Sequence, residues 1–337
     1  FDYFFAVKFH SASFVVAVLF AAFTFSTQPS AQADTFGTSG NEFTIDFVNI
    51  SNAGNIADST TYGAVPYEYR ASTYEITQDA ITKATASGMA NVTAGAWTGN
   101  QPAATISWYE AAAFVNFLNT SSGKTAAYNL TYSGSWSMAL WSSDQAWTTG
   151  GTNRYRNKDA YYFLPSENEW YKAAYYNAAG TNYFLFPSAA SGGVSGLGPS
   201  FGMSGRPIAV ASGTNAGTAV YNGSATIPAI TNPAIVDNAG GLSAYGTMGQ
   251  GGNVWEWIES ASDGTNNSPS EQRTVRGGSW DSGERHLRSP LRENVDPTVE
   301  RDSWGFRVAS VPEPSTYVLV LMGAGALYLW KRRKSSL

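Results

Sequence analysis

The sequence of 337 residues contains no cysteine. This absence excludes disulfide bonds, thiolate metal sites and a cysteine nucleophile throughout the chain. Charged residues are also scarce, since they make up 13% of the sequence and leave a formal net charge of −5. A protein that binds nucleic acid normally carries a basic face, so the composition predicts no nucleic-acid partner.

Apolar and aromatic residues are plentiful by comparison. Hydrophobic residues make up 43% of the sequence and aromatic residues 14%, which is enough for a sizeable core in one large domain or two small ones. Gly, Ser, Thr, Asn and Ala take the place of charged residues, so we expect a polar but weakly charged surface. Without disulfides, the protein must draw its stability from its core or from a bound metal.

The first 33 residues have the features of an export signal. Lys8 and His10 precede the apolar run SASFVVAVLFAAFTFS. The small residues Ala31 and Ala33 follow and provide a cleavage site. An N-terminal membrane anchor is the alternative. The apolar run is short for a membrane span and the small residues follow at the right distance, so we predict a signal peptide over residues 1–33.

Residues 311–337 form a second segment of unusual composition. It begins with Pro312, Glu313 and Pro314, continues with an apolar run over residues 316–330, and ends in a cluster of Lys and Arg. As a helix the apolar run would span about 22 Å at 1.5 Å per residue, whereas the hydrocarbon core of a membrane is about 30 Å thick. The basic cluster would stay on the cytoplasmic side. These features predict a marginal membrane anchor.

The order of these three parts resembles the PEP-CTERM sorting signal of bacterial exported proteins. The resemblance implies that a membrane-embedded exosortase recognises the tail and cleaves near the Pro-Glu-Pro motif. An ordinary tail anchor is the alternative, and the short apolar run favours the sorting signal. We therefore expect an exported protein that is transiently anchored in the membrane and then resides in the cell envelope or the extracellular matrix.

Between the two signals, residues 34–310 contain no convincing linker and no repeat, so we predict one domain. Phe43, Ile45 and Phe47 alternate with polar residues, which is the period of a half-buried strand. Residues 67–77 are predicted as another strand.

Two helices are predicted from a shared start pattern, in which Ser is followed three residues later by Glu. The pattern occurs as SWYE at residues 107–110 and as SENE at residues 166–169. This capping box satisfies free N–H groups at a helix start. Gly123 and Gly180 are the predicted stops. Residues 188–226 are rich in Gly, Ser, Ala and Thr and are predicted as long surface loops.

Six short motifs occur in order along this domain. They are YEIT (74–77), ISWYEAAAFVNFLN (106–119), YFLPSENEWYKAAYY (162–176), SAYGTMGQGGNVWEW (243–257), VRGGSW (275–280) and WGFRV (304–308). Together they resemble the formylglycine-generating enzyme, or sulfatase-modifying-factor, family. The resemblance covers most of residues 42–309. It implies a C-type-lectin-like fold, that is, a single α+β domain rich in loops, with few helices and short twisted strands.

The motif GGNVWEW has two interpretations. It is either a buried strand or turn with packed tryptophans, or a metal site. In a metal site, Asn253 and Glu256 would supply hard oxygen ligands and the neighbouring carbonyl of Val254 would help to complete the shell. The family that the chain resembles binds Ca²⁺ at the matching Asn and Glu, so we expect a structural calcium ion. Asp237 and Asn238 form a second, weaker oxygen cluster.

The family's oxidases convert a sulfatase cysteine into formylglycine with copper that is held by two cysteines. These cysteines lie just after the Gly-Gly-Ser-aromatic motif. In this chain Ser282 stands about where the first would lie, and residues 284–289 cover the place of the second. A hydroxyl does not bind Cu(I) usefully, because Cu(I) needs soft thiolates. We therefore expect no copper and no transfer of the family's reaction.

Histidine offers little more for catalysis. An iron-dependent branch of the superfamily uses several histidines, and only His286 lies beyond the predicted signal peptide. His286 with Asp281 and Ser282 or Ser289 has the residue types of a hydrolytic triad but no supporting fold context. A solvated or hydrogen-bonded surface histidine is the alternative.

The segment of residues 271–302 holds six arginines and seven acidic residues. The near balance of signs favours structural Arg–carboxylate pairs, and an anion-binding site is the alternative. The motifs VRGGSW and WGFRV are predicted to pair, with Trp280 packed on Trp304.

Two functions of different class remain open. The first is a non-catalytic domain that binds a glycan, polymer or protein through its loops. The candidate ligand-binding residues are Trp280, Asp281, Ser282, Arg285, His286, Arg288, Arg292 and Trp304. The second is an enzyme, either a divergent formylglycine-generating oxidase or another reaction in the same cleft. The missing cysteine pair favours the first.

Overall fold

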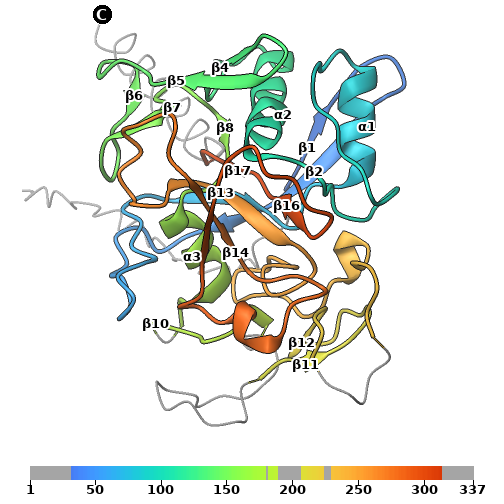
Figure 1. The fold of residues 1–337 in the computed structure, drawn as a ribbon. Coiled ribbons are helices and arrows are strands. Elements are labelled where there is room, and N and C mark those ends of the chain that lie inside the picture. The colour runs from blue at the N-terminus through green and yellow to red at the C-terminus, as the bar shows by residue number, and fades with distance from the viewer. Residues whose placement is uncertain (1–31, 180, 189–205, 224–228, 313–337) are drawn as a thin grey trace, which may run out of the picture. The chain divides into compact units, whose positions relative to one another are not determined.

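The computed structural model describes residues 32–179, 181–188, 206–223 and 229–312 (Figure 1). Outside the described residues lie Ala31, Glu313, Pro314 and the apolar run 316–330. Ala33 of the predicted cleavage site lies in the first strand. Within the described ranges, no helix has the length and hydropathy to cross a membrane.

The described elements are mostly short strands with a few helices. The helices are α1 (Gln78–Ala86), α2 (Trp108–Ser121) and α3 (Glu167–Tyr175). The strands are β1 (Gln32–Phe36), β2 (Phe43–Ile50), β3 (Tyr69–Ser72), β4 (Asn129–Tyr132), β5 (Trp136–Ala139), β6 (Ala146–Trp147), β7 (Asn153–Asn157), β8 (Tyr162–Phe163), β9 (Tyr176–Asn177), β10 (Asn182–Tyr183), β11 (Ile208–Ala209), β12 (Thr218–Ala219), β13 (Trp255–Ala261), β14 (Arg273–Arg276), β15 (Glu293–Val295), β16 (Trp304–Phe306) and β17 (Ala309–Ser310). This is the expected α+β, loop-rich domain.

Two sheets organise the domain. The larger has the strand order β1-β2-β3-β17-β8, and the other has the order β15-β14-β13-β16. In the first sheet the last strand of the described chain lies between β3 and β8, with Ala309 opposite both Ala71 and Phe163. The end of the domain is therefore held by strands that come from its first half.

The strand pattern predicted at residues 43–50 is confirmed in β2, where Phe43, Ile45 and Phe47 are buried. The strand predicted over residues 67–77 is confirmed only for Tyr69–Ser72. Beyond it the backbone leaves β3, since the next N–H groups donate to carbonyls of β2 and β16. The chain then enters α1, which the sequence analysis did not predict.

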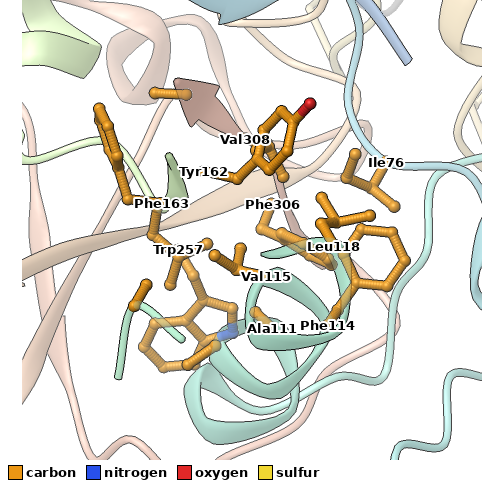
Figure 2. Close-up of a cluster of buried hydrophobic side chains, with 14 of the residues drawn as sticks. Ile76, Ala111, Phe114, Val115, Leu118, Tyr162, Phe163, Trp257, Phe306 and Val308 are labelled. Carbon is orange, nitrogen blue, oxygen red and sulfur yellow. The ribbon is translucent and has the colours of Figure 1, made fainter. Parts of the chain in front are cut away.

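Helix α2 begins at the predicted capping box, and both of the box's hydrogen bonds are present. The helix is buried on nearly all sides, and Figure 2 shows its apolar side chains among those of the two sheets. Phe114 contacts Phe306 of β16 edge to face, with ring centroids 5.6 Å apart. Aromatic pairs of this geometry stabilise by about 0.5–1.5 kcal/mol beyond the area they bury. Gly123 follows the helix with a positive φ of 71°, as predicted.

Helix α3 also begins at its predicted capping box, formed by Ser166 and Glu169. Its predicted end near Gly180 is wrong, because the helix stops at Tyr175. Tyr176 adopts extended backbone angles and pairs with Tyr183 in the β9–β10 hairpin. The Tyr176 side chain is buried, so tertiary packing overrides the helical pattern here.

The predicted pairing of VRGGSW with WGFRV is wrong, because β13 lies between the two motifs. β14 runs antiparallel to β13, and β16 runs parallel to it on the other edge. All residues of β13 are buried, so both of its edges need a backbone partner. Trp304 packs on Trp257 of β13 with ring centroids 5.2 Å apart, whereas Trp280 contacts Trp97 at 6.0 Å.

Lys172 of α3 is a buried cation in this fold. Its Nζ donates a hydrogen bond to the carbonyl of Asn52 at 2.9 Å. Burial lowers the pKa of Lys172 from its ordinary 10.5 to about 8, although Glu68 opposes the shift. Between these two pH values the unfolded chain binds a proton that the folded protein does not, so stability rises with pH.

We therefore expect Lys172→Met to remove this contribution. The free energy of unfolding of the variant minus that of the wild type should grow as the pH falls from 10.5 to 8 and stay constant below. Urea unfolding across this range measures the difference, and Lys83→Met, on a partly exposed lysine of α1, is the control. A flat difference curve, or one that matches the control, contradicts the prediction.

Candidate functional site

The candidate site is built on residues 277–292, which we call the post-β14 loop. Gly277 and Gly278 open it with positive φ angles of 101° and 74°. A Cβ on Gly277 would lie 2.9 Å from the carbonyl oxygen of Gln250, and one on Gly278 would lie 3.0 Å from the Leu287 side chain. Only glycine permits both the φ angles and the close approach, so the pair turns the loop back onto the body of the domain.

Leu287 anchors the far side of this loop. Its side chain is fully buried in a cluster with Phe186 and Tyr221, and its carbonyl accepts a hydrogen bond from the Tyr175 hydroxyl at 3.1 Å. The loop is thus held at its start by the glycines and near its middle by one apolar side chain. The residues between these two points form a turn of fixed shape.

Ser279 contacts two other polar side chains of this turn. The Ser279 hydroxyl donates a hydrogen bond to Asp281, and the hydroxyls of Ser279 and Ser282 lie 2.7 Å apart. The carbonyl of Ser282 accepts a hydrogen bond from the N–H of Asn222 at 2.9 Å. Ser279 is buried and Asp281 is exposed, so the group runs from the interior to the surface. These are hard oxygen groups, which suit hydrogen bonding rather than redox chemistry.

His286 does not complete a triad with them. Its ring lies 5.7 Å from that of Trp255, and its Nδ1 lies 3.2 Å from the carbonyl oxygen of Gly283. Among the contacts of the described residues, none joins the imidazole to Asp281 or Ser282. Ser289 is buried and its N–H donates to the carbonyl of Leu185. A nucleophile needs its base within hydrogen-bond reach, so this arrangement is not a hydrolytic triad.

Three of the six arginines in residues 271–302 form ion pairs with carboxylates, which agrees in part with the pairing expected from the balance of charges. Arg276 and Arg292 both lie against one oxygen of Glu167, at 2.6 Å and 2.9 Å. Arg288 pairs with Glu284 at 2.8 Å. These arginines hold the loop in place.

The predicted ligand-binding residues differ in their exposure to solvent. Asp281 and Arg285 are exposed, and Ser282 and His286 are half-buried beside them. Trp304 is buried and cannot present its side chain to a ligand. The structure thus reduces the candidate binding surface to the outer part of the loop, together with the half-buried rings of Trp280 and Trp97.

The expected calcium ligands have protein partners. Both oxygens of Glu256 accept hydrogen bonds from Arg307 at 2.6 Å, and one also accepts from the indole N–H of Trp170. The Asn253 side-chain oxygen accepts from the N–H of Ala234 at 2.9 Å. This donor set does not fit a calcium ion, because Arg307 already supplies the positive charge opposite Glu256. Bound calcium stays a prediction that elemental analysis tests.

The weaker oxygen cluster is not brought together. Asp237 lines a pocket of about 340 Å³ with Glu42 and Asp79, whereas Asn238 is not among its lining residues. Val254, expected to contribute a carbonyl, is buried, and its N–H faces Glu75. Across the described ranges, no group of three or more His, Cys, Asp or Glu side chains converges as a metal site.

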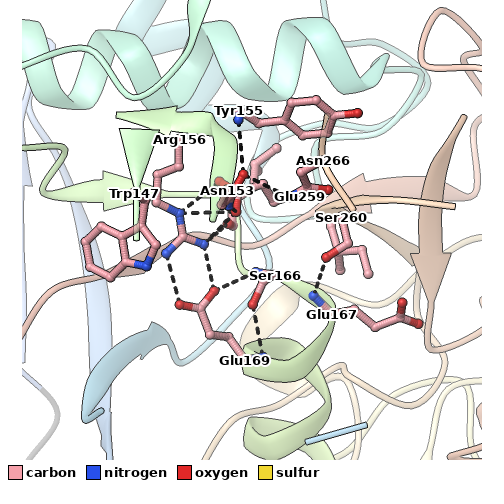
Figure 3. A network of polar contacts seen from close by, with 12 residues as sticks. Trp147, Asn153, Tyr155, Arg156, Ser166, Glu167, Glu169, Glu259, Ser260 and Asn266 are labelled. Atoms are coloured by element: carbon pink, nitrogen blue, oxygen red, sulfur yellow. Dashed lines mark hydrogen bonds and ion pairs between the residues drawn. The ribbon is translucent and has the colours of Figure 1, made fainter. Parts of the chain in front are cut away.

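A polar network that the sequence analysis missed lies between β7, α3 and β13 (Figure 3). The Arg156 guanidinium donates to Glu169 at 2.8 Å and to Glu259 at 2.7 Å, and all three side chains are buried. Burial raises the pKa of Glu259 against the effect of Arg156. At Glu169 burial also acts upward, but Arg156 and the hydrogen bonds from Ser166 and Tyr67 together outweigh it and lower the pKa. The three residues are too far apart in the sequence for any local pattern to join them.

Comparison with known proteins agrees with this architecture. The model of the sulfatase-modifying factor enzyme 1-like domain matches residues 21–311, and the model of the PEP-CTERM protein-sorting motif matches residues 310–334. A search of the curated proteins finds no match to the sequence.

Two solved structures are similar in fold. Treponema denticola variable protein 1 is 21% identical, with a TM-score of 0.51 over 84% of this chain and 100% of its own. The structure titled "Crystal Structure of CarF" is 19% identical, with a TM-score of 0.53 over 80% of this chain and 99% of its own. At these identities the likeness concerns the fold alone.

The geometry of the loop start predicts the effect of one substitution. Gly277→Ala should lower the free energy of unfolding by about 1–3 kcal/mol, because alanine is strained at a φ of 101° and its Cβ would meet the Gln250 carbonyl. Gly283→Ala in the same loop is the control, since its Cβ would have no neighbour within 4 Å. Urea unfolding of both variants measures the effect, and equal stabilities would show that the tight turn is unimportant.

Proposed function

We propose, from the premise that this chain belongs to the sulfatase-modifying factor family and carries a PEP-CTERM sorting motif, that it is an exported protein whose domain binds a ligand without catalysis. The sorting motif supports export and recognition by a membrane-embedded exosortase. The family match does not show a binding role. The side chains of the post-β14 loop support it.

One observation carries the proposal. Ser282 stands about where the first copper-binding cysteine of the family's oxidases would lie, and the hydroxyl of Ser279 contacts both Ser282 and Asp281. Hydroxyls and a carboxylate neither bind Cu(I) usefully nor exchange electrons. The loop therefore lacks the ligands that the family's oxidation reaction requires. The scaffold around the loop is nevertheless complete, with its glycine turn and its buried anchor Leu287.

The outer part of the loop suits binding. Arg285 and Asp281 expose charges of opposite sign on a turn that the domain holds rigid. A fixed loop loses little conformational entropy when a ligand binds, and this favours affinity. Such a surface suits a polar partner with hydrogen-bonding groups, such as a glycan, another polymer or a protein. A divergent oxidase or another enzyme in the same cleft is the competing function.

The absence of oxidase activity can be tested directly. We would load the purified protein with Cu(I) and incubate it with a cysteine-containing sulfatase peptide. The mass of the peptide should stay unchanged, because the chain has no thiolate to hold the metal. Mass spectrometry of the peptide is the measurement, and the same peptide with serine in place of cysteine is the control. Conversion of the cysteine to formylglycine would overturn the non-catalytic assignment.

The binding surface can be tested with an immobilised panel of acidic and neutral polysaccharides. Arg285→Ala and Asp281→Asn should weaken retention of the bound polymer at least tenfold, which is about 1.4 kcal/mol, without lowering the melting midpoint. Lys158→Ala, on an exposed cation outside the loop, is the control and should bind like the wild type. If no polymer is retained, or if both loop variants bind normally, the surface has been assigned incorrectly.

A further inference from the structure

A second pocket, with a volume of about 260 Å³, lies beside the Arg156 network. Its lining residues include Tyr62, Tyr67, Trp147, Asn153, Glu167, Asn168 and Ser260. They come from the loop before β3, the β6–β7 hairpin, the start of α3 and the end of β13. None of the lining residues belongs to the post-β14 loop, so this pocket is separate from the surface proposed above.

The walls of the pocket follow from the local sequence. Residues 148–152 form the turn of the β6–β7 hairpin, and Gly150 has a positive φ of 83°. A Cβ on Gly150 would approach Pro66 at 3.1 Å and the Tyr67 ring at 3.4 Å. Glycine therefore lets this turn lie close to the loop before β3, and the two segments enclose one side of the pocket.

One side of the pocket is aromatic. The rings of Trp147 and Tyr67 meet edge to face with centroids 5.6 Å apart, and both are half-buried. The indole N–H of Trp147 donates to the carbonyl of Thr149 at 2.8 Å, and the Tyr67 hydroxyl donates to Glu169 at 2.7 Å. With their polar atoms engaged inside the protein, these rings present apolar surface to the pocket.

The other side supplies hydrogen-bonding groups of both kinds. Both arginine partners of Glu167 lie against its Oε1, and among the described contacts its Oε2 has no partner. Ser260 Oγ accepts from the N–H of Glu167 at 2.9 Å, so its hydroxyl proton is free to donate. The Asn168 side-chain oxygen accepts from the N–H of Gly63 at 3.0 Å, and its NH₂ group has no partner among those contacts.

The charges around the pocket cancel. Its charged lining residues are Arg156 and Glu167, and their ion-pair partners are Glu169, Glu259, Arg276 and Arg292. Their sum is zero, and each carboxylate already has a guanidinium partner. A charged ligand would find no counter-ion here and would lose its hydration without compensation.

We propose that this pocket binds one residue of a neutral sugar, with the sugar's C–H face on the aromatic side and its hydroxyls on Glu167, Asn168 and Ser260. A sugar ring has one apolar face and a rim of groups that both donate and accept, which matches the two sides of the pocket. The volume is slightly below the range of about 300–1,000 Å³ typical of drug-sized ligands, so it suits a single ring.

Titration calorimetry and saturation-transfer NMR with methyl glycosides of glucose, galactose and mannose test the proposal. At least one should bind with a Kd of about 1 mM or tighter, as expected for a single ring. Glucuronate and glucosamine should bind at least tenfold more weakly, because the pocket is neutral. Asn168→Asp keeps the acceptor for Gly63 and removes the free donor, so it should weaken binding of the neutral sugar at least tenfold.

Trp147→Ala should abolish the saturation-transfer signal of the glycoside. If the Trp147→Ala variant does not fold, Asn168→Asp still tests the site. Asn267→Asp, at an exposed position outside the pocket, should bind like the wild type. Arg285→Ala should also bind the glycosides normally, which separates this site from the post-β14 loop. The proposal is overturned if no glycoside binds at about 10 mM, if the charged sugars bind better, or if Asn168→Asp has no effect.

Discussion

The pairing of buried arginines with buried carboxylates is the interaction on which this domain depends. Arg156 binds Glu169 and Glu259 together, and so joins β7, α3 and β13 at one point. Arg307 similarly holds Glu256 at the start of β13. Removing one partner of such a pair leaves an uncompensated buried charge and costs about 3–5 kcal/mol. In a chain without disulfides and with long loops, these pairs fix which segments lie together.

The central strand β13 explains how the pairs support function. It is buried on both faces, its two edges are covered by β14 and β16, and it carries Glu256 and Glu259. The post-β14 loop follows β14, which pairs with the start of β13. The pocket lined by Trp147 and Glu167 lies beside the other end of β13, at Ser260. Both candidate binding regions therefore lie next to a fully buried strand that is paired on both edges, and this limits the entropy that a ligand must remove.

The family's oxidases use cysteine thiolates, and the post-β14 loop of this chain contains none. The loop has a tight glycine turn at Gly277 and Gly278, and Leu287 is packed beneath it. The oxidase chemistry needs thiolates, whereas Ser282 stands about where the first of the two cysteines would lie, and residues 284–289, which cover the place of the second, contain no cysteine. A rigid turn of this kind suits the proposed recognition role, because it can present different side chains to a partner.

The sequence by itself determined the features that depend on neighbouring residues. The two capping boxes, the alternation in β2 and the terminal sorting motif are local patterns, and each could be predicted. The end of α3, the separation of Trp280 from Trp304, the pairing of Glu256 with Arg307 and the Arg156 network were decided only by the tertiary structure. Arg156 and Glu259 are 103 residues apart in the sequence, and Glu256 and Arg307 are 51 apart. Burial and charge in the folded core select such partners, and a local sequence pattern carries no information about them.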